Sequence, residues 1–250
     1  MSDVTVATGE GFVATVELHR PPENYFDAAL VEAIAEAYER LDADPGCRAI
    51  VLCSEGRHFC AGARLGGGGV DETARLYAAA VRMFAAGTPV VAAVQGAAVG
   101  GGLGLALSAD FRVAAPESRF SANFARLGFH HGFGLTVTLP EVAGRQAAAD
   151  LLYTGRRVRG DEARALGLSD RLVPAERVRD EARALAAEIA GSAPLAVRAI
   201  RKTLRGDLAE RVRAAVEREA FEQARLAATE DFGEGVRAMA ERRAPRFTGR

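Results

Sequence analysis

The amino-acid sequence predicts an α/β fold with a helical C-terminal region, and three observations carry this prediction. Nearly continuous apolar runs at residues 48–56 and 89–96 are bounded by turn residues, which is typical of strands buried on both faces. Each run leads into a glycine-rich loop and then into a segment with helical character. From Leu135 onward the chain is helical in character, with interruptions at Gly155, Gly160, Pro174 and Pro194. Repeated strand-to-helix crossovers imply a largely parallel sheet with helices packed outside it.

The elements of this sheet follow one another in the N-terminal half. Residues 12–19 settle into alternating apolar and polar positions, which indicates a half-buried strand. Asp27 can cap a helix whose apolar positions recur at helical spacing, namely Leu30, Ile34, Ala37 and Leu41. A further helix, residues 71–87, separates the two buried strands. Its acidic start, Asp71 and Glu72, suits a helix N-terminus.

Length and composition predict a soluble globular protein. The 250 residues are 49% hydrophobic and 26% charged, and 32 basic residues nearly cancel 33 acidic ones. Nothing in this balance favours a nucleic-acid partner or an anionic membrane, and no apolar run reaches the roughly 18 residues of a membrane span. The N-terminus has acidic residues where a signal peptide would carry positive charge, so we expect a cytoplasmic protein.

The cysteines and the long helical tail refine this expectation. Cys47, Cys53 and Cys60 have spacings that match neither a zinc site nor a disulfide framework, so we expect reduced thiols. No low-complexity linker divides the chain. We therefore predict an α/β core at residues 1–193 that is continued by a helical region at residues 194–250.

Two glycine clusters stand where an α/β sheet commonly binds its ligand. Residues 56–69 contain six glycines, and Gly100, Gly101 and Gly102 precede a leucine- and alanine-rich segment. Glycine lets backbone approach a ligand closely, and a helix N-terminus offers unpaired N–H donors to negative charge. The pattern indicates an anion or oxyanion pocket, while tight turns and close helix packing explain the same glycines without a ligand. A nucleotide-phosphate site is less favoured, because neither G-x-G-x-x-G nor G-K-[ST] is present in these loops.

Longer stretches resemble one known family. The segments GRHFCAGARL, PVVAAVQGAAVGGGLGLALSADFRVAA, LPEVAGRQAAADLLYTGRRVRGDEARALGLSDRLVP and TEDFGEGVRAMAERRAPRFTG closely resemble the crotonase family, also called the enoyl-CoA hydratase/isomerase family. The N-terminal RPPENYFDAALVEAIAEAYERLDADPGCRAIVLCSEG resembles the corresponding part, so the likeness covers nearly the whole chain in order.

The resemblance implies a fold, a ligand and a site. It implies a spiral of ββα units with a C-terminal helical region, assembled as a homotrimer or homohexamer. It implies an acyl-CoA substrate, with coenzyme A as part of that substrate and no permanently bound cofactor. The two backbone N–H donors of the oxyanion hole would come from Ala63 and Gly101. Residues expected at the acyl-CoA are Ala61, Gly62, Arg64, Leu65 and the basic Arg242 near the C-terminus.

The carboxylates that the family uses for hydration do not carry over. The glutamate that follows the triple glycine by two residues is replaced by Gly104, and the glutamate of a motif like FGLPE is replaced by Phe124. Arg64 stands where the family usually has aspartate. Hydration needs one group to activate water and one to deliver a proton, each contributing about 10²–10⁴-fold, so ordinary hydratase activity is not expected. A non-catalytic acyl-CoA binding protein is the alternative.

Two histidines offer a replacement acid or base. His130 and His131 lie in LGFHHGFG, which the resemblance places near the active site, and histidine titrates near neutral pH. Packing or a surface loop would explain both equally simply. Tyr77 and Met83 could line an acyl pocket, although core packing is the simpler role. His19 and His58 have no metal-ligand spacing, and no metal site is expected.

Overall fold

The computed structural model describes residues 2–63 and 69–250, and the strands in these ranges form two sheets. The larger sheet has the order β1-β2-β3-β4-β6-β9 and the smaller one β5-β7-β8. The strands are β1 Val4–Thr8, β2 Val13–Leu18, β3 Ala49–Ser54, β4 Val90–Val94, β5 Ala97–Val99, β6 Phe111–Ala114, β7 Arg119–Ser121, β8 Arg157–Arg159 and β9 Arg171–Leu172.

The larger sheet is parallel from β2 to β9, as the crossover pattern predicts. Strands β2, β3, β4, β6 and β9 pair in parallel, and only β1 joins the edge antiparallel, on β2. β3 and β4 are buried along their whole length. The predicted strands at 12–19, 48–56 and 89–96 are confirmed, and β1 is an addition that the sequence pattern did not reveal.

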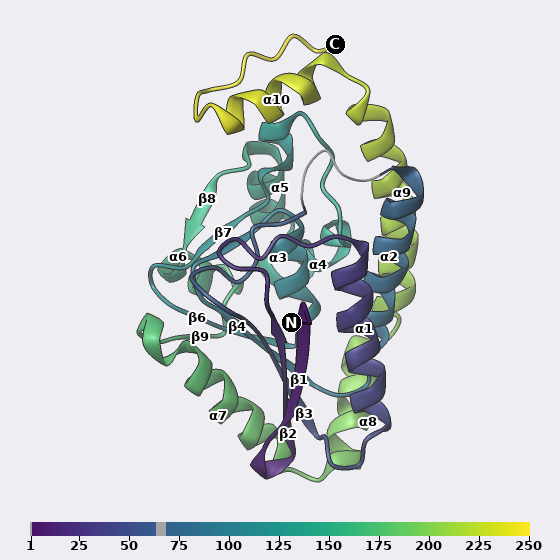
Figure 1. Cartoon of the computed structure of the whole chain (residues 1–250), viewed down its shortest axis with the longest axis vertical. Helices are drawn as coiled ribbons and strands as arrows, with labels where there is room; N and C mark the ends of the chain where they lie inside the picture. Colours follow the sequence, from purple (N-terminus) through teal and green to yellow (C-terminus); the bar gives the residue numbers. More distant parts are fainter. Residues whose placement is uncertain (1, 64–68) are drawn as a thin grey trace.

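Helices cover both faces of the larger sheet, which explains why its central strands are apolar on both sides. In β3, Ile50 and Leu52 face one hydrophobic core, and Val51 and Cys53 face the other. α1 and α2 belong to the first core, and α7 closes the second (Figure 1). The helices are α1 Ala28–Ala43, α2 Val70–Ala85, α3 Gly101–Ser108, α4 Leu135–Ala143, α5 Arg145–Thr154, α6 Gly160–Ala165, α7 Val178–Ala190, α8 Pro194–Arg205, α9 Leu208–Ala227 and α10 Glu230–Ala240, with 3₁₀ turns η1 Glu10–Phe12, η2 Asn123–Leu127 and η3 Ala175–Arg177.

The helix starts agree with the predicted capping. The Asp27 carboxylate accepts a hydrogen bond of 3.0 Å from the Leu30 N–H at the start of α1. Asp71 and Glu72 lie in the first turn of α2, where negative charge is favoured. Tyr77 and Met83 of α2 are buried in the main core, as their simpler interpretation predicts.

The region after Leu135 is less uniformly helical than predicted. The short strands β8 and β9 interrupt it, and each pairs with a strand from earlier in the chain. They lie next to Gly155 and before Pro174, the breakers that the sequence does show. Two- and three-residue strands carry too little periodicity to be recognised from the sequence. The domain boundary at residue 193 remains a prediction.

The C-terminal helices pack on the core and on η2, the 3₁₀ turn that follows β7. α9 lies along α2 (Figure 1), and α10 packs against η2. The contact is close, because a Cβ on Gly235 would lie 2.5 Å from the backbone of Leu127. Among the described residues, no helix is both long and apolar enough to cross a membrane.

α8 is held to the core by charge rather than by apolar contact. Arg201 and Arg205 donate to the Asp110 carboxylate, each at 2.9 Å, and the Val90 N–H donates to the same group at 2.8 Å. Arg201 is 8% exposed. A buried guanidinium is stable only with such partners. Asp110 therefore joins α8 to the start of β4.

Removing this carboxylate is expected to destabilise the fold. We expect Asp110→Ala to lower the free energy of unfolding by about 3–5 kcal/mol, because it removes the only carboxylate that pairs with the largely buried Arg201 and Arg205 in the described part of the chain, and the acceptor of the Val90 N–H. The matched control is Asp207→Ala, which removes an exposed pair with Arg211 and should cost at most about 1 kcal/mol. Urea unfolding at one fixed protein concentration measures both, and equal losses would contradict this role for Asp110.

Candidate active site

The first glycine loop runs alongside β5 and reaches the start of α3. Cys60 donates to the Ala97 carbonyl at 2.9 Å and accepts from the Val99 N–H at 3.0 Å, so residues on either side of Ala98 hold it. On its other side the loop meets the N-terminal segment, where the Phe26 N–H donates to the Gly62 carbonyl at 3.0 Å. These backbone bonds fix the loop in place up to Ala63.

Glycines make this crossing possible. Gly62 has φ +103°, and a Cβ there would lie 2.8 Å from the Val99 oxygen and 3.7 Å from the Gly101 nitrogen. A Cβ on Gly102 would lie 2.8 Å from the Cys60 carbonyl carbon, and one on Gly101 would overlap the Phe26 ring. No side chain fits at these positions without a shift of its surroundings. The two loops therefore meet backbone to backbone.

Two N–H donors become available at this crossing. Within residues 2–63 and 69–250, neither the Ala63 nor the Gly101 N–H donates a backbone hydrogen bond. Gly101 is the first residue of α3, where the N–H groups have no partner inside the helix and the helix dipole favours negative charge. The arrangement suits a developing oxyanion. Arg64 and Leu65, which the sequence also assigns to the ligand, lie outside the described residues.

Aromatic rings occupy the surroundings of this crossing. The Phe124 Cζ would lie 3.7 Å from a Cβ on Gly100, and Asn123 Oδ1 would lie 3.3 Å from it. Gly104 is buried in α3, and a Cβ there would lie 2.6 Å from the Cβ of Phe133. The Phe133 ring in turn packs on that of Phe26, with centroids 5.4 Å apart. Phe133 therefore fills the space where a side chain at position 104 would begin.

The double-histidine segment, His130 and His131, is separated from Phe133 by Gly132 alone and packs on α9. The rings of His130 and His131 stack with centroids 4.1 Å apart. His130 Nδ1 lies 2.7 Å from the His131 carbonyl oxygen, and His131 Nε2 lies 2.9 Å from Thr136 Oγ1. Burial, and then the nearby His130, lower the pKa of His131 to about 4. His131 is therefore uncharged at neutral pH.

Three residues hold this segment that the sequence did not assign to it, namely Glu219, Gln223 and Tyr77. Glu219 of α9 is fully buried and accepts from the backbone N–H groups of Gly134 and Thr136. Gln223, one turn further along α9, donates to the His130 carbonyl at 3.0 Å and accepts from the Tyr77 hydroxyl at 2.7 Å. One sequence signal could have identified these two residues. Glu219 and Gln223 continue the helix face of the apolar Val212 and Val216, which places them on the side of α9 that faces the core.

The remaining sequence candidates lie apart from this segment. The Ala61 N–H donates to the Glu23 carbonyl at 2.9 Å, which fixes the loop next to Ala63. Arg242 lies on the exposed turn after α10. His19 bonds Thr5 and Glu55, and nowhere in residues 2–63 and 69–250 do three or more His, Cys, Asp or Glu side chains gather as metal ligands would. Burial raises the pKa of the Cys60 thiol to about 12, so it is not a nucleophile.

A family model described as enoyl-CoA hydratase/isomerase matches residues 8–250. The chain belongs to the enoyl-CoA hydratase/isomerase family. Carnitinyl-CoA dehydratase of Proteus mirabilis is 33% identical over the full length of both chains. A provisional enoyl-CoA hydratase of Thermus thermophilus is 37% identical over 97% of this chain and 100% of its own.

Solved structures agree with this membership. An enoyl-CoA hydratase/isomerase from Pseudoalteromonas atlantica superposes with a TM-score of 0.88 at 30% identity, covering 99% of this chain and 100% of that one. An enoyl-CoA hydratase from Mycobacterium avium gives 0.86 at 28% identity and 99% coverage of both. The predicted crotonase-like α/β fold is confirmed.

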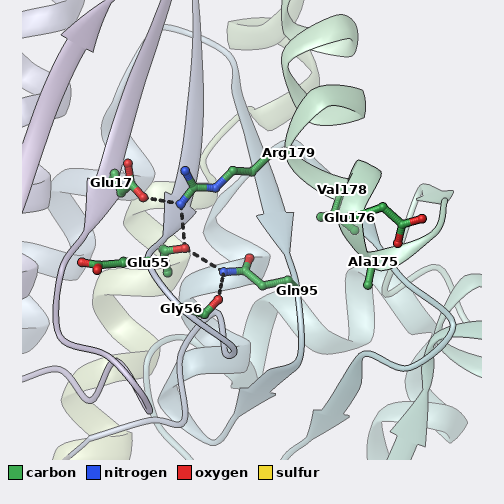
Figure 2. Close-up of a pocket in the computed structure, with 9 residues that line it drawn as sticks. Glu17, Glu55, Gly56, Gln95, Ala175, Glu176, Val178 and Arg179 are labelled. Carbon is green, nitrogen blue, oxygen red and sulfur yellow. Dashed lines mark hydrogen bonds and ion pairs between the residues drawn. The ribbon is translucent and has the colours of Figure 1, made fainter.

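This member of the hydratase/isomerase family also has a pocket of about 360 Å³ at the carboxyl ends of β2, β3 and β4. Figure 2 shows Arg179 of α7 reaching across it to Glu17 and to the Ser54 carbonyl, and the Gln95 amide donating to Ser54 and Gly56. Its lining residues among those described do not include Ala63 or Gly101. The bonds of Arg179 and Gln95 join α7 and the end of β4 to the end of β3, so we interpret the pocket as part of the junction of α7 with the sheet.

The loop crossing yields a test of stability. We expect Gly102→Ala to destabilise the family fold by about 1–3 kcal/mol, because the added methyl group overlaps the Cys60 carbonyl in a packed core. The matched control is Gly233→Ala in α10, where the nearest atom is the flexible end of Arg237 at 3.3 Å. That change should be neutral or stabilise by up to about 1 kcal/mol. Thermal unfolding compares the two, and an unchanged midpoint for Gly102→Ala would contradict the close crossing.

Proposed function

We propose that this protein binds an acyl-CoA and stabilises the enolate of its thioester with the backbone N–H groups of Ala63 and Gly101. The observation that carries the proposal is the close crossing of the two glycine loops, beside which both donors lie without a backbone partner in the described part of the chain. Family membership supports the acyl-CoA ligand. The N-terminus of α3 adds a dipole that favours the same negative charge.

Formation of the enolate moves one proton and one electron pair. A base takes a proton from the carbon next to the thioester carbonyl, and the electron pair of that C–H bond shifts so that charge develops on the carbonyl oxygen. The two N–H groups donate to this oxygen, and each is worth about 10²–10³ in rate. His130 or His131 supplies the base. The polarised carbonyl suits isomerisation, decarboxylation, thioester hydrolysis or an atypical hydration.

Ordinary hydration by a pair of glutamates is not part of the proposal. The two positions that the resemblance assigns to those glutamates hold Gly104 and Phe124, and neither side chain exchanges a proton. Phe133 fills the space beside Gly104, which favours an apolar pocket around the acyl chain. The absence of an acid or base side chain at positions 104 and 124 supports a second candidate, a non-catalytic protein that binds acyl-CoA and performs no chemistry.

Assembly and cellular setting form part of the proposal. The outward face of α8 carries three apolar side chains, Leu195, Ile200 and Leu204, which are exposed by 83%, 59% and 82%, together with the exposed Lys202, while Arg201 and Arg205 face inward. Such a face suits contact with further copies of the chain in a homotrimer or homohexamer. Arg242 offers positive charge to a coenzyme A phosphate of a neighbouring copy. The free thiols of Cys47, Cys53 and Cys60 suit the cytoplasm.

Exchange of the α-protons of butyryl-CoA in D₂O, followed by proton NMR, tests enolate formation whatever the later reaction is. We expect the protein to catalyse this exchange and Ala63→Pro to slow it by about 10²–10³, because proline has no N–H to donate. Ala63→Ser is the matched control, since it keeps the N–H and changes an exposed side chain, and it should exchange at nearly the unaltered rate.

Three outcomes would contradict parts of this proposal. Equal rates for the proline and serine variants would remove Ala63 from the oxyanion hole. Binding of butyryl-CoA by calorimetry without any exchange would favour the non-catalytic binding protein. Hydration of crotonyl-CoA as fast as by a family member that retains both glutamates would show that Gly104 and Phe124 do not abolish hydration.

The apolar face of α8 predicts the assembly. Light scattering after size exclusion is expected to give the mass of a trimer or hexamer, and the double change Leu195→Arg and Leu204→Arg should give monomers, because it introduces charge into the contact. Tyr153→Arg is the control, since Tyr153 is also exposed, by 80%, but lies on α5. A monomeric native protein, or an unchanged mass for the double variant, would refute this interface.

A further inference from the structure

The buried carboxylate of Glu219 organises the double-histidine segment from behind. Its Oε2 accepts from the Gly134 N–H at 2.9 Å. Its Oε1 accepts from the Thr136 N–H at 3.0 Å and from the Thr136 hydroxyl at 2.7 Å. A carboxylate only accepts hydrogen bonds, so the single proton of the Thr136 hydroxyl is used on Glu219.

This bond decides which nitrogen of His131 carries the proton. His131 Nε2 lies 2.9 Å from the same Thr136 oxygen, which has only lone pairs left to offer. Nε2 must therefore donate, and His131 is the Nε2–H tautomer with its lone pair on Nδ1. Burial keeps this ring neutral, as the lowered pKa of His131 shows.

The neighbouring imidazole is fixed in the opposite sense. His130 Nδ1 lies 2.7 Å from the His131 carbonyl, which can only accept, so Nδ1 carries the proton and Nε2 holds the lone pair. Gln223 donates to the His130 carbonyl, and the Tyr77 hydroxyl holds Gln223, so the peptide is clamped from α9 and α2. No hydrogen-bond partner for His130 Nε2 is found among residues 2–63 and 69–250.

Because the two imidazole rings stack, a positive charge on one ring acts on the other. With centroids 4.1 Å apart, two charged imidazoles would repel, and the nearby His130 is the second cause, after burial, of the lowered pKa of His131. The other ionisable groups near the pair are Glu219, Tyr77 and Glu222, and Glu222 is paired with Arg218 and Arg225.

We infer that Glu219 is a positioning residue, which acts through Thr136 to hold His131 as the neutral Nε2–H tautomer. The His131 carbonyl, held in the same segment, accepts from His130 Nδ1–H, and His130 Nε2 is the proton acceptor. The inference rests on the proposed function only in giving His130 that role, since the tautomers are a property of the free protein. On enolate formation, the proton of the substrate Cα–H bond moves to His130 Nε2, and the electron pair shifts toward the thioester oxygen.

Long-range proton–nitrogen NMR of the histidine-labelled protein tests the tautomers without any substrate. The chain has four histidines, and single variants of each assign the signals. At pH 7 we expect His131 as the Nε2–H form and His130 as the Nδ1–H form. Thr136→Val should turn His131 into a mixture of tautomers, because Nε2 loses its acceptor, while Thr136→Ser should preserve the native pattern. Glu219→Gln should disturb it, and Glu217→Gln, on the exposed face of α9, should not.

The exchange of butyryl-CoA protons connects these tautomers to activity. His130→Ala should slow exchange by about 10²–10⁴, and Thr136→Val should slow it by a smaller factor that Thr136→Ser restores. A charged or Nδ1–H His131 in the native protein, or a tautomer unchanged by Thr136→Val, would overturn the role of Glu219. Expected tautomers with unchanged exchange in His130→Ala would instead overturn His130 as the base and leave the positioning by Glu219 intact.

Discussion

The closest backbone approach in the candidate site is the constraint on which its geometry depends. The first glycine loop passes the start of α3 so closely that a methyl group on Gly62 or Gly102 would overlap the backbone of Val99 or Cys60. The same approach brings Gly62, the residue before Ala63, close to the start of α3, since a Cβ on Gly62 would lie 3.7 Å from the Gly101 nitrogen. Because the N–H donors of the proposed site belong to the backbone, they are present whatever side chains stand at positions 104 and 124.

Aromatic rings fill the space around the start of α3. Phe133 occupies the volume beside Gly104, and the Phe124 ring lies near Gly100. Phe133 also follows the double-histidine segment, so the turn that fills the space beside Gly104 also carries His130 and His131. Polar groups are thus concentrated on the side that faces α9, and apolar rings on the side that faces α3.

Local signals in the sequence predicted much of the fold. The uniformly apolar β3 and β4, the Asp27 cap and the glycines after each buried strand all depend on near neighbours in the chain. The short strands β8 and β9 escaped prediction because their pairing partners lie far away in sequence and their length carries no periodicity. Glu219 and Gln223 escaped for a related reason. A polar residue on a helix is usually exposed, and the sequence does not show that a distant segment supplies hydrogen-bond donors to it in the core.

α8 and α9 both turn a charged side chain inward, but they differ in where their apolar side chains lie. α9 places Val212 and Val216 in the core and then turns a buried carboxylate toward Gly134 and Thr136, so its polar group serves the site. α8 turns Arg201 toward Asp110 and leaves its leucines outside. A helix with charge inside and apolar side chains outside gains little from folding alone, since its apolar surface stays in water. Within one chain α8 is held by Asp110, by Asp42 through Arg198, and by backbone carbonyls that accept from Arg201 and Arg205. Its apolar face gains stability only when another surface covers it.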